Sequence, residues 1–191
     1  LNGTSGNEER VREYILSKLP PECETAVDAL GNLIVTKKGA KTPKNKVMLC
    51  AHMDEVGFIA TMINDDGSIK FAPVGGINAS AVFGRKVRSE SGVMGVIAAK
   101  ATHLVKDDEK EKQPEISALS IDIGASSAEE AEKSVRQGEC FYFESKFFDF
   151  GENMLKGKAL DDRVGCAVLI GLLNSPLPCD LTCVFTVQEE I

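Results

Sequence analysis

The sequence is poor in residues on which many ligand sites depend, with no tryptophan, 2 tyrosines and 2 histidines among 191 residues. Clefts that bind carbohydrate are usually lined by aromatic side chains, so this composition argues against a sugar-binding protein. Long apolar runs are also missing. The longest one extends from Val164 to Leu173 and falls well short of the roughly 20 residues that a membrane-spanning helix needs. We therefore expect no membrane partner.

Cysteine pairs of the C-x-x-C type are absent as well, although the chain has 6 cysteines. This absence excludes a zinc knuckle, which depends on that spacing. Cys50, Cys166 and Cys183 lie in apolar runs, where a thiol behaves as a small buried hydrophobic group. Because neither a regular disulfide framework nor a secretory signal pattern is found, we expect a protein of the reducing cytoplasm.

Positive charge is in deficit. The chain has 22 lysines and arginines against 29 aspartates and glutamates, which gives a formal net charge of −7. Such a protein repels a phosphate backbone, and no stripe of basic residues is interleaved with aromatic ones. The composition therefore predicts that nucleic acid is not a partner.

The start of the chain has a helical pattern. Residues 5–21 predict a helix that ends at two prolines, and Ser5 and Glu8 stand at the spacing of a capping box. Apolar residues recur at helical spacing within it and are expected to face the core: Val11, Tyr14, Ile15 and Leu19.

Apolar runs elsewhere predict strands. A β-branched run at 34–36 indicates one strand, and the runs at 47–51 and 182–187 indicate two more. The run 47–51 is apolar on both faces, as strands in the centre of a parallel sheet tend to be. Between them, residues 156–176 predict a helix with two aspartates at its start, and four of its residues share one apolar face: Val164, Val168, Gly171 and Leu172. Strands that alternate with helices predict an α/β fold with a parallel sheet.

The middle of the chain has a different pattern from the two α/β segments. Short strand-like pieces separated by Gly, Asn and Asp turns indicate a small β-rich domain. Within it, Ser127 and Glu130 predict the start of a helix, and the charged run 106–112 predicts a solvated loop. We therefore predict an α/β domain whose first part is 1–60 and whose second part is 150–191, interrupted by a β-rich insertion at 61–149.

Polar residues follow two of the predicted strands. In open α/β sheets, ligands bind beyond the carboxyl ends of the strands. His52 and Asp54 follow the run 47–51, Glu189 and Glu190 follow the run 182–187, and Asp161 stands with Asp162 at a helix start. One imidazole and several carboxylates on a shared rim make a donor set suited to Zn²⁺, Co²⁺ or Mn²⁺.

The spacing within these clusters suggests separate roles. Residues two apart in an extended segment point to the same side, so Asp54 is placed to hold the ring of His52. The neighbours Glu189 and Glu190 point opposite ways, so one can bind metal while the other handles protons. Each cluster alone is also compatible with an ordinary structural role, and His103, which has no acid cluster beside it, is expected to be structural.

Several stretches resemble one family: DALGNLIV, CAHMDEVGFIATMINDDGSIKFAPVGG, GKALDDRVGCAVLIGLL and VFTVQEEI. The chain resembles the cobalt- or zinc-dependent aminopeptidases that form tetrahedral (TET) particles, peptidase family M42, which are related to glutamyl and deblocking aminopeptidases. The resemblance implies a phosphorylase/hydrolase-like α/β catalytic domain interrupted by a PDZ-like β-barrel domain used in assembly. It also implies peptide substrates and a homo-oligomer built from dimers, up to a dodecamer.

The resemblance also implies residue roles. His52 would bind one of two divalent ions, Asp161 would bridge both ions, and Glu190 would bind the second. Glu189 would be the general acid/base, and Asp54 would orient His52. Only motif alignment favours Asp161 over Asp162 as the bridge. Family members carry a further Asp and His ligand after the Q-E-E-[IV]-G segment. We therefore expect the chain to be the N-terminal part of a longer enzyme and to be inactive by itself.

Three other functions compete with this one. Paired carboxylates such as Asp161 and Glu189 could serve as acid and base in a glycoside hydrolase, and proteins of this resemblance are sometimes labelled endoglucanases. The chain could also be a non-catalytic assembly module, in which the β-rich domain makes oligomer contacts. A related metal-dependent hydrolase of dipeptides or acyl groups is the third.

Overall fold

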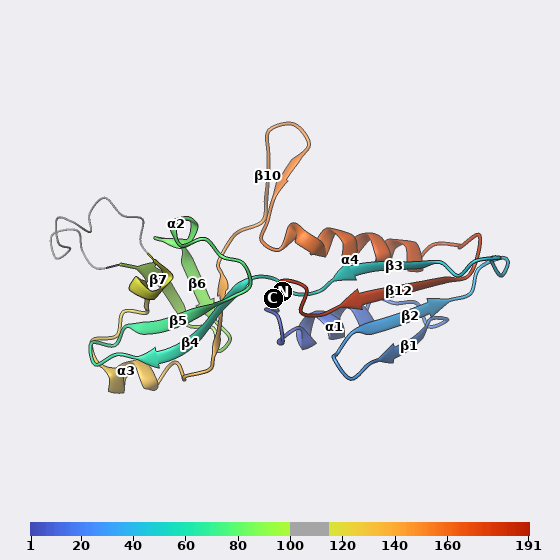
Figure 1. The fold of residues 1–191 in the computed structure, drawn as a ribbon. Coiled ribbons are helices and arrows are strands. Elements are labelled where there is room, and N and C mark those ends of the chain that lie inside the picture. Colours follow the sequence, from blue (N-terminus) through green and yellow to red (C-terminus); the bar gives the residue numbers. More distant parts are fainter. Residues whose placement is uncertain (100–114) are drawn as a thin grey trace. The chain divides into compact units, whose positions relative to one another are not determined.

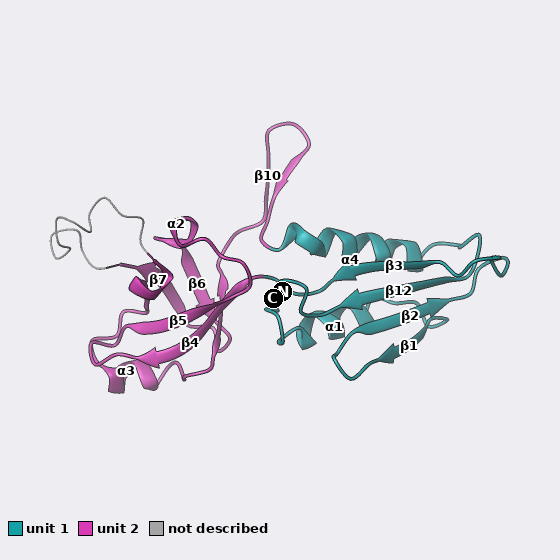
Figure 2. Ribbon diagram, in the orientation of Figure 1, with its two compact units in different colours: residues 1–55, 159–191 teal, residues 56–158 magenta. Residues whose placement is uncertain are grey.

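The computed structural model describes residues 1–99 and 115–191. The charged run 106–112 and His103 lie outside this part. The chain divides into two compact units (Figure 2): unit 1 comprises Leu1–Glu55 and Ala159–Ile191, and unit 2 comprises Val56–Lys158. In the described part, no helix is both long enough and apolar enough to cross a bilayer. The assignment of the segments 1–60, 61–149 and 150–191 as catalytic and assembly domains stays a prediction.

Unit 1 is built on a four-stranded sheet in the order β1-β2-β12-β3 (Figure 1). Only β12 and β3 run parallel, because β2 is antiparallel to both of its neighbours. The expected parallel sheet is therefore a mixed sheet among the described residues. Its elements are β1 (Glu24–Val27), β2 (Leu33–Lys37), β3 (Met48–His52) and β12 (Leu181–Thr186), with the helices α1 (Glu9–Leu16) and α4 (Leu160–Leu173).

Among the strands that the structure describes, β3 lies at the edge of this sheet and not at its centre. Its first three residues are exposed, with Met48 at 63% of its maximal exposure, and only Ala51 and His52 are buried. The prediction of a strand buried on both faces was wrong, because an apolar run records composition and not how many neighbours a strand has.

The core of unit 1 lies between the sheet and the helices. Tyr14 does not join it and is exposed, and the shared apolar face of α4 also points outward, with Val164 and Val168 more than half exposed. The helix α4 buries a different set of residues against the sheet. The main buried side chains are Val11, Ile15, Leu33, Val35, Cys166, Leu169, Leu173, Cys183 and Phe185.

Unit 2 contains a closed barrel of six strands in the order β4-β5-β8-β7-β6-β9. Closure leaves no free edge, and Phe58, Ile121 and Phe141 fill the interior with no exposed surface. The likeness to a PDZ domain stays a prediction. The strands are β4 (Gly57–Ile63), β5 (Ile69–Val74), β6 (Lys86–Ser89), β7 (Met94–Ala98), β8 (Ser120–Asp122) and β9 (Cys140–Phe143), with helices α2 (Ala79–Val82), η2 (Ile116–Ala118) and α3 (Ala128–Glu132).

Two further strands of unit 2 form a ribbon outside the barrel. The strands β10 (Phe148–Phe150) and β11 (Met154–Lys156) pair only with each other in the described part of the chain. Large apolar side chains on and beside this ribbon are exposed: Phe147, Phe148, Phe150, Met154 and Leu155. A two-stranded ribbon is marginally stable alone, so these side chains are candidates for contact with another surface.

The two predicted capping boxes have different outcomes. At α3, the hydroxyl of Ser127 accepts a hydrogen bond from the backbone of Glu130, as predicted. At α1, no side chain caps the helix start, and the Ser5 hydroxyl donates to Asp54 instead. The expected role of Ser5 and Glu8 was wrong because tertiary partners compete for the same side-chain oxygens.

Candidate functional site

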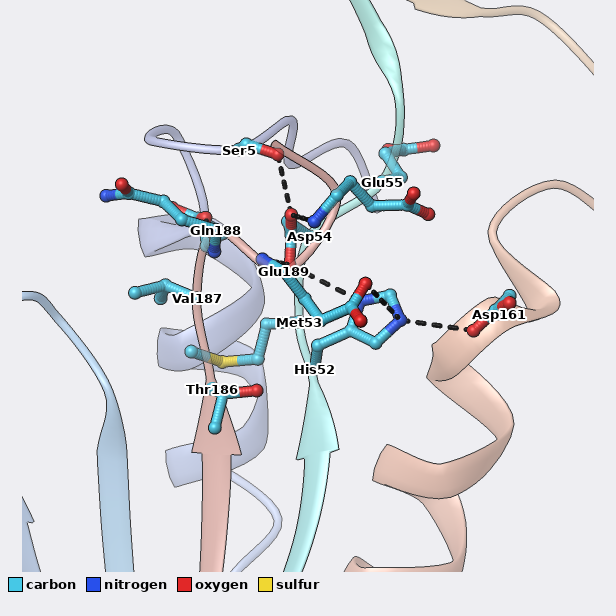
Figure 3. A network of polar contacts seen from close by, with 12 residues as sticks. Ser5, His52, Met53, Asp54, Glu55, Asp161, Thr186, Val187, Gln188 and Glu189 are labelled. Carbon is cyan, nitrogen blue, oxygen red and sulfur yellow. Dashed lines mark hydrogen bonds and ion pairs between the residues drawn. The ribbon is translucent and has the colours of Figure 1, made fainter. Parts of the chain in front are cut away.

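The parallel pair β3 and β12 brings two clusters of polar residues to the same place. His52 is paired in register with Thr186, the last residue of β12, and the Met53 amide donates to the Thr186 carbonyl at 2.7 Å. The segments that follow the two strands therefore leave the sheet side by side. Figure 3 shows His52, Asp54 and Glu189 gathered there, with Asp161 facing them from the start of α4.

The imidazole of His52 is the centre of this cluster. Its Nε2 lies 3.1 Å from Asp161 Oδ1 and 3.9 Å from Glu189 Oε2. The histidine side chain is 9% exposed, whereas those of Asp161 and Glu189 are 89% and 62% exposed. One nearly buried ring thus faces two carboxylates that solvent and a ligand can reach.

Asp161 and Asp162 are neighbours with different partners. Asp161 faces His52, whereas Asp162 Oδ1 accepts a hydrogen bond at 2.9 Å from the backbone of Gly165 in its own helix. A Cβ atom at position 165 would lie 2.4 Å from that oxygen, so the glycine is needed for this contact. The structure therefore brings Asp161, and not Asp162, next to the imidazole.

The contact between His52 and Asp54 is close but not a hydrogen bond. Nδ1 of His52 lies 3.3 Å from Asp54 Oδ1, yet this buried nitrogen has no hydrogen-bond partner among the described residues. Burial alone would lower the pKa of His52. The hydrogen bond with Asp161 and the charges of Asp54 and Glu189 outweigh that effect, so the pKa lies above its ordinary value.

Asp54 is fully buried, and its oxygens accept hydrogen bonds from three groups. The Ser5 hydroxyl donates at 2.6 Å, and the backbone amides of Glu189 and Glu190 donate at 3.1 Å each. Burial would raise the pKa of Asp54, but the bonds from Ser5 and the two amides outweigh it and lower the pKa below its ordinary value. Asp54 is therefore a buried anion that holds the segment carrying both glutamates.

The surroundings of Glu190 differ from those of Asp54. Burial raises its pKa, the positive charge that His52 can carry opposes this, and the negative charges of Asp161, Asp54 and Glu189 add to the increase.

Behind the site, the thiol of Cys166 donates to the His52 carbonyl at 3.2 Å. Burial raises the pKa of this thiol to about 11, so it stays protonated and acts as a donor.

The chemistry of these donors fits a divalent ion, although the set is incomplete. Within residues 1–99 and 115–191, no group of three or more histidine, cysteine, aspartate or glutamate side chains is arranged to hold a metal by itself. Two donors of one zinc ion, each about 2.0–2.2 Å from it, lie at most about 4.4 Å apart. The separations of His52 Nε2 from Asp161 and Glu189 both fall within that limit.

Sequence patterns missed Asn32, and they predict a different role for Ser5 and Glu8. Glu8 accepts from the Gln188 amide at 3.0 Å, and Asn32 accepts from the Val187 amide at 2.9 Å. For Ser5 and Glu8 the S-x-x-E pattern is the available signal, and by itself it predicts a local helix cap. None of these contacts is local, since Glu8 and Gln188 are separated by 180 positions.

Known proteins resemble the chain over its whole length. The glutamyl aminopeptidase of Lactococcus lactis subsp. cremoris is 32% identical over 205 residues, covering 100% of this chain and 57% of the relative. The TET1 peptidase of Pyrococcus horikoshii, which assembles into a tetrahedron or a large octahedral shell, is 35% identical with a TM-score of 0.87, over 100% of this chain and 59% of that one.

A third similar protein bears a different name. The solved structure of an endoglucanase from Thermotoga maritima is 39% identical with a TM-score of 0.83, and the match covers 100% of this chain and 57% of that one. The chain thus spans little more than half the length of these proteins. The family model of the M42 glutamyl aminopeptidases matches residues 31–191. The chain therefore belongs to the M42 glutamyl aminopeptidase family.

Proposed function

We propose that the protein is a metal-dependent aminopeptidase that removes N-terminal residues from peptides. The observation that carries this proposal is the meeting of His52, Asp161 and Glu189 at the carboxyl end of a parallel strand pair. The chain belongs to a family of aminopeptidases, and the imidazole and carboxylates at this rim are donors that borderline divalent ions prefer.

His52, Asp161 and Glu190 would hold two divalent ions, with Zn²⁺ or Co²⁺ favoured and Mn²⁺ as a further candidate. Such ions polarise a scissile carbonyl and lower the pKa of water. Two observations support metal binding by these residues. His52 Nε2 and Asp161 Oδ1 are 3.1 Å apart, and Glu190 lies among negatively charged carboxylates that a cation would neutralise. Asp161 is the better candidate for the shared ligand, because Asp162 is engaged within its own helix.

Glu189 is proposed to be the proton carrier. Its carboxylate is 62% exposed and lies 3.9 Å from the imidazole, so it can reach water and substrate while its backbone stays held by Asp54. In this role the carboxylate takes a proton from the attacking water and delivers it to the departing amine. The carboxylates of the rim also suit the positive α-amino group that marks the start of a peptide.

We propose that a complete site also uses donors outside the described residues, so that the 191-residue chain alone lacks full activity. Two facts support this. The described donors do not form a group that can hold a metal by itself, and the chain spans 57% of its glutamyl aminopeptidase relative.

The decisive experiment is hydrolysis of aminoacyl anilides by the complete gene product, with and without Co²⁺ or Zn²⁺. Glu189→Gln should lower kcat by about 10²- to 10⁴-fold while the metal content stays near normal, since the residue handles protons and is not a ligand. Glu13→Gln, an exposed change on α1, is the matched control and should behave like the unchanged protein. Loss of metal from Glu189→Gln would reverse the roles of the two glutamates.

A glycoside hydrolase is the second candidate, favoured by the name of the Thermotoga relative. Asp161 and Glu189 both lie beside His52 and could serve as its carboxylate pair. Hydrolysis of cellulose that persists in the presence of a chelator would support this function over the peptidase.

We further propose that the protein forms a homo-oligomer through unit 2, which gives the β-rich insertion its role in assembly. The support is the assembly of the Pyrococcus relative together with the exposed apolar side chains of the β10–β11 ribbon. A second copy of the chain is the occupant that this surface is proposed to contact.

A further inference from the structure

The residues that follow β12 are held by side chains from elsewhere in unit 1. We call residues 187–190 the glutamate segment. Each of its amides donates to a side-chain oxygen: Val187 to Asn32 at 2.9 Å, Gln188 to Glu8 at 3.0 Å, and Glu189 and Glu190 to the two oxygens of Asp54 at 3.1 Å each. Among residues 1–99 and 115–191, this segment has no strand partner, since β12 ends at Thr186.

Glu8 is the member of this set whose role is unaccounted for. The residue is only 5% exposed, and a single oxygen, Oε1, accepts from both the Gly6 amide at 2.9 Å and the Gln188 amide at 3.0 Å. It stands at the start of α1 but makes no side-chain cap there. This buried carboxylate thus makes no cap for its own helix, and it binds the backbone of the residue before the two glutamates as well as that of Gly6.

The residue that Glu8 holds has a demanding backbone conformation. Gln188 has a φ of 58°, in the left-handed region that residues with a Cβ atom adopt at a cost. This turn decides where the following two side chains point. A hydrogen bond to its amide is therefore placed to keep Glu189 directed toward His52.

Ser5 acts on the same segment through Asp54. Its hydroxyl donates at 2.6 Å to Asp54 Oδ2, the oxygen that also accepts from the Glu190 amide. Both polar residues of the S-x-x-E pattern are thus attached to the glutamate segment, Glu8 directly and Ser5 through Asp54. Figure 3 shows Ser5, Asp54 and Gln188 grouped above the imidazole.

We infer that Glu8 is a positioning residue for the reaction, which fixes the glutamate segment through the Gln188 amide, and that Ser5 supports it through Asp54. This inference rests on the proposed function, in which Glu189 carries the proton and Glu190 is a ligand. A displacement of about 1 Å in a reacting group can cost on the order of 10² in rate, so a distant anchor affects turnover without touching substrate.

The test compares Glu8→Ala with Glu8→Gln and with Glu13→Ala as a matched change on α1. Because the bonds from Gly6 and Gln188 end on one oxygen, glutamine keeps that acceptor, while it loses the charge and carries an amide nitrogen in place of the second oxygen. Hydrogen exchange measured by mass spectrometry should show exchange of residues 187–190 at least about 10-fold faster in Glu8→Ala, with residues 181–186 unchanged. Glu8→Gln should restore most of the protection, and Glu13→Ala should have no effect.

Kinetics of the complete gene product provide the second readout. We expect Glu8→Ala to lower kcat for an aminoacyl anilide about 10- to 100-fold with KM within about twofold, and Glu8→Gln to recover most of kcat. If Glu8→Ala does not fold, Ser5→Ala should still accelerate exchange at Glu189 and Glu190.

Unchanged exchange of residues 187–190 in these variants, or faster exchange spread equally over all of unit 1, would overturn the inference. Absence of peptidase activity in the unchanged complete gene product would instead refute the proposed function. The exchange measurement would still decide whether Glu8 orders the glutamate segment.

Discussion

Replacing Asp54 by asparagine tests how strongly one buried carboxylate stabilises unit 1. Asp54 accepts one backbone amide on each oxygen, from Glu189 on Oδ1 and from Glu190 on Oδ2. Asparagine offers one acceptor oxygen, so its amide nitrogen must face one of these two N–H groups. At least one donor then loses its partner, whichever way the side chain is turned.

The size of the effect follows from that mismatch. A donor left without a partner costs about 1–3 kcal/mol, and the remaining bonds lose the assistance of the negative charge. The amides are partly buried, so we expect the free energy of unfolding of unit 1 to fall by about 2 kcal/mol. Unit 2 contains none of these groups and should be unaffected.

Hydrogen exchange in increasing urea measures each unit separately, with peptides from β2 and β12 for unit 1 and from β4 and β9 for unit 2. Asp149→Asn, an exposed change on β10, is the control and should stay within about 0.5 kcal/mol of the unchanged protein. A loss below about 0.5 kcal/mol in Asp54→Asn, or an equal loss in both units, would refute this account of Asp54.

Three further predictions concern other parts of the molecule. Burial would raise the pKa of Glu139, but hydrogen bonds from Ser91 outweigh this and lower the pKa below its ordinary value of 4.5. The stabilisation by this carboxylate is therefore present above pH 4.5 and is lost as the pH falls through the lowered pKa. Glu139→Gln should make the loss of stability at acid pH less steep, as measured by unfolding followed by circular dichroism. Leu173→Ala should lower the stability of unit 1 by about 2–5 kcal/mol in urea titrations, because this side chain is fully buried, and a smaller loss would mean that the site collapses around the change. Replacing Phe148 and Phe150 by serine should convert an oligomer into 20.5 kDa monomers in light scattering without lowering the melting temperature of the barrel, whereas an undiminished particle would place the contact elsewhere.

Local patterns predicted the elements of the fold better than their surroundings. The helix near Ser127 and the strands around Val35, Cys50 and Cys183 all form, because capping and apolar runs act within a few residues. The edge position of β3 and the exposed Val164 face of α4 were not predictable in this way. They depend on which strand lies beside which, and a run of apolar residues carries no such information.

The same difference between local patterns and long-range contacts applies to the candidate site. Strand ends and a helix start were sufficient to predict a shared rim of one imidazole and several carboxylates, because sheet geometry brings strand ends together. In the structure, His52 lies there beside Asp161 and Glu189. Their metal and proton roles, the cytoplasmic location and the absence of nucleic-acid partners stay predictions. The contact of Glu8 with Gln188 was missed because the two residues are 180 positions apart, a distance over which no spacing rule operates.

The order of strands in unit 1 also decides when the sheet can form during translation. The strand β12 lies between β2 and β3, so these two strands, both made earlier, do not pair with each other and must wait for residues 181–186. The whole of unit 2 emerges from the ribosome in between and is contiguous, so it can close its barrel first. Nascent β2 and β3 meanwhile carry unpaired edges, and a chaperone that shields them would be needed longest for this part of the molecule.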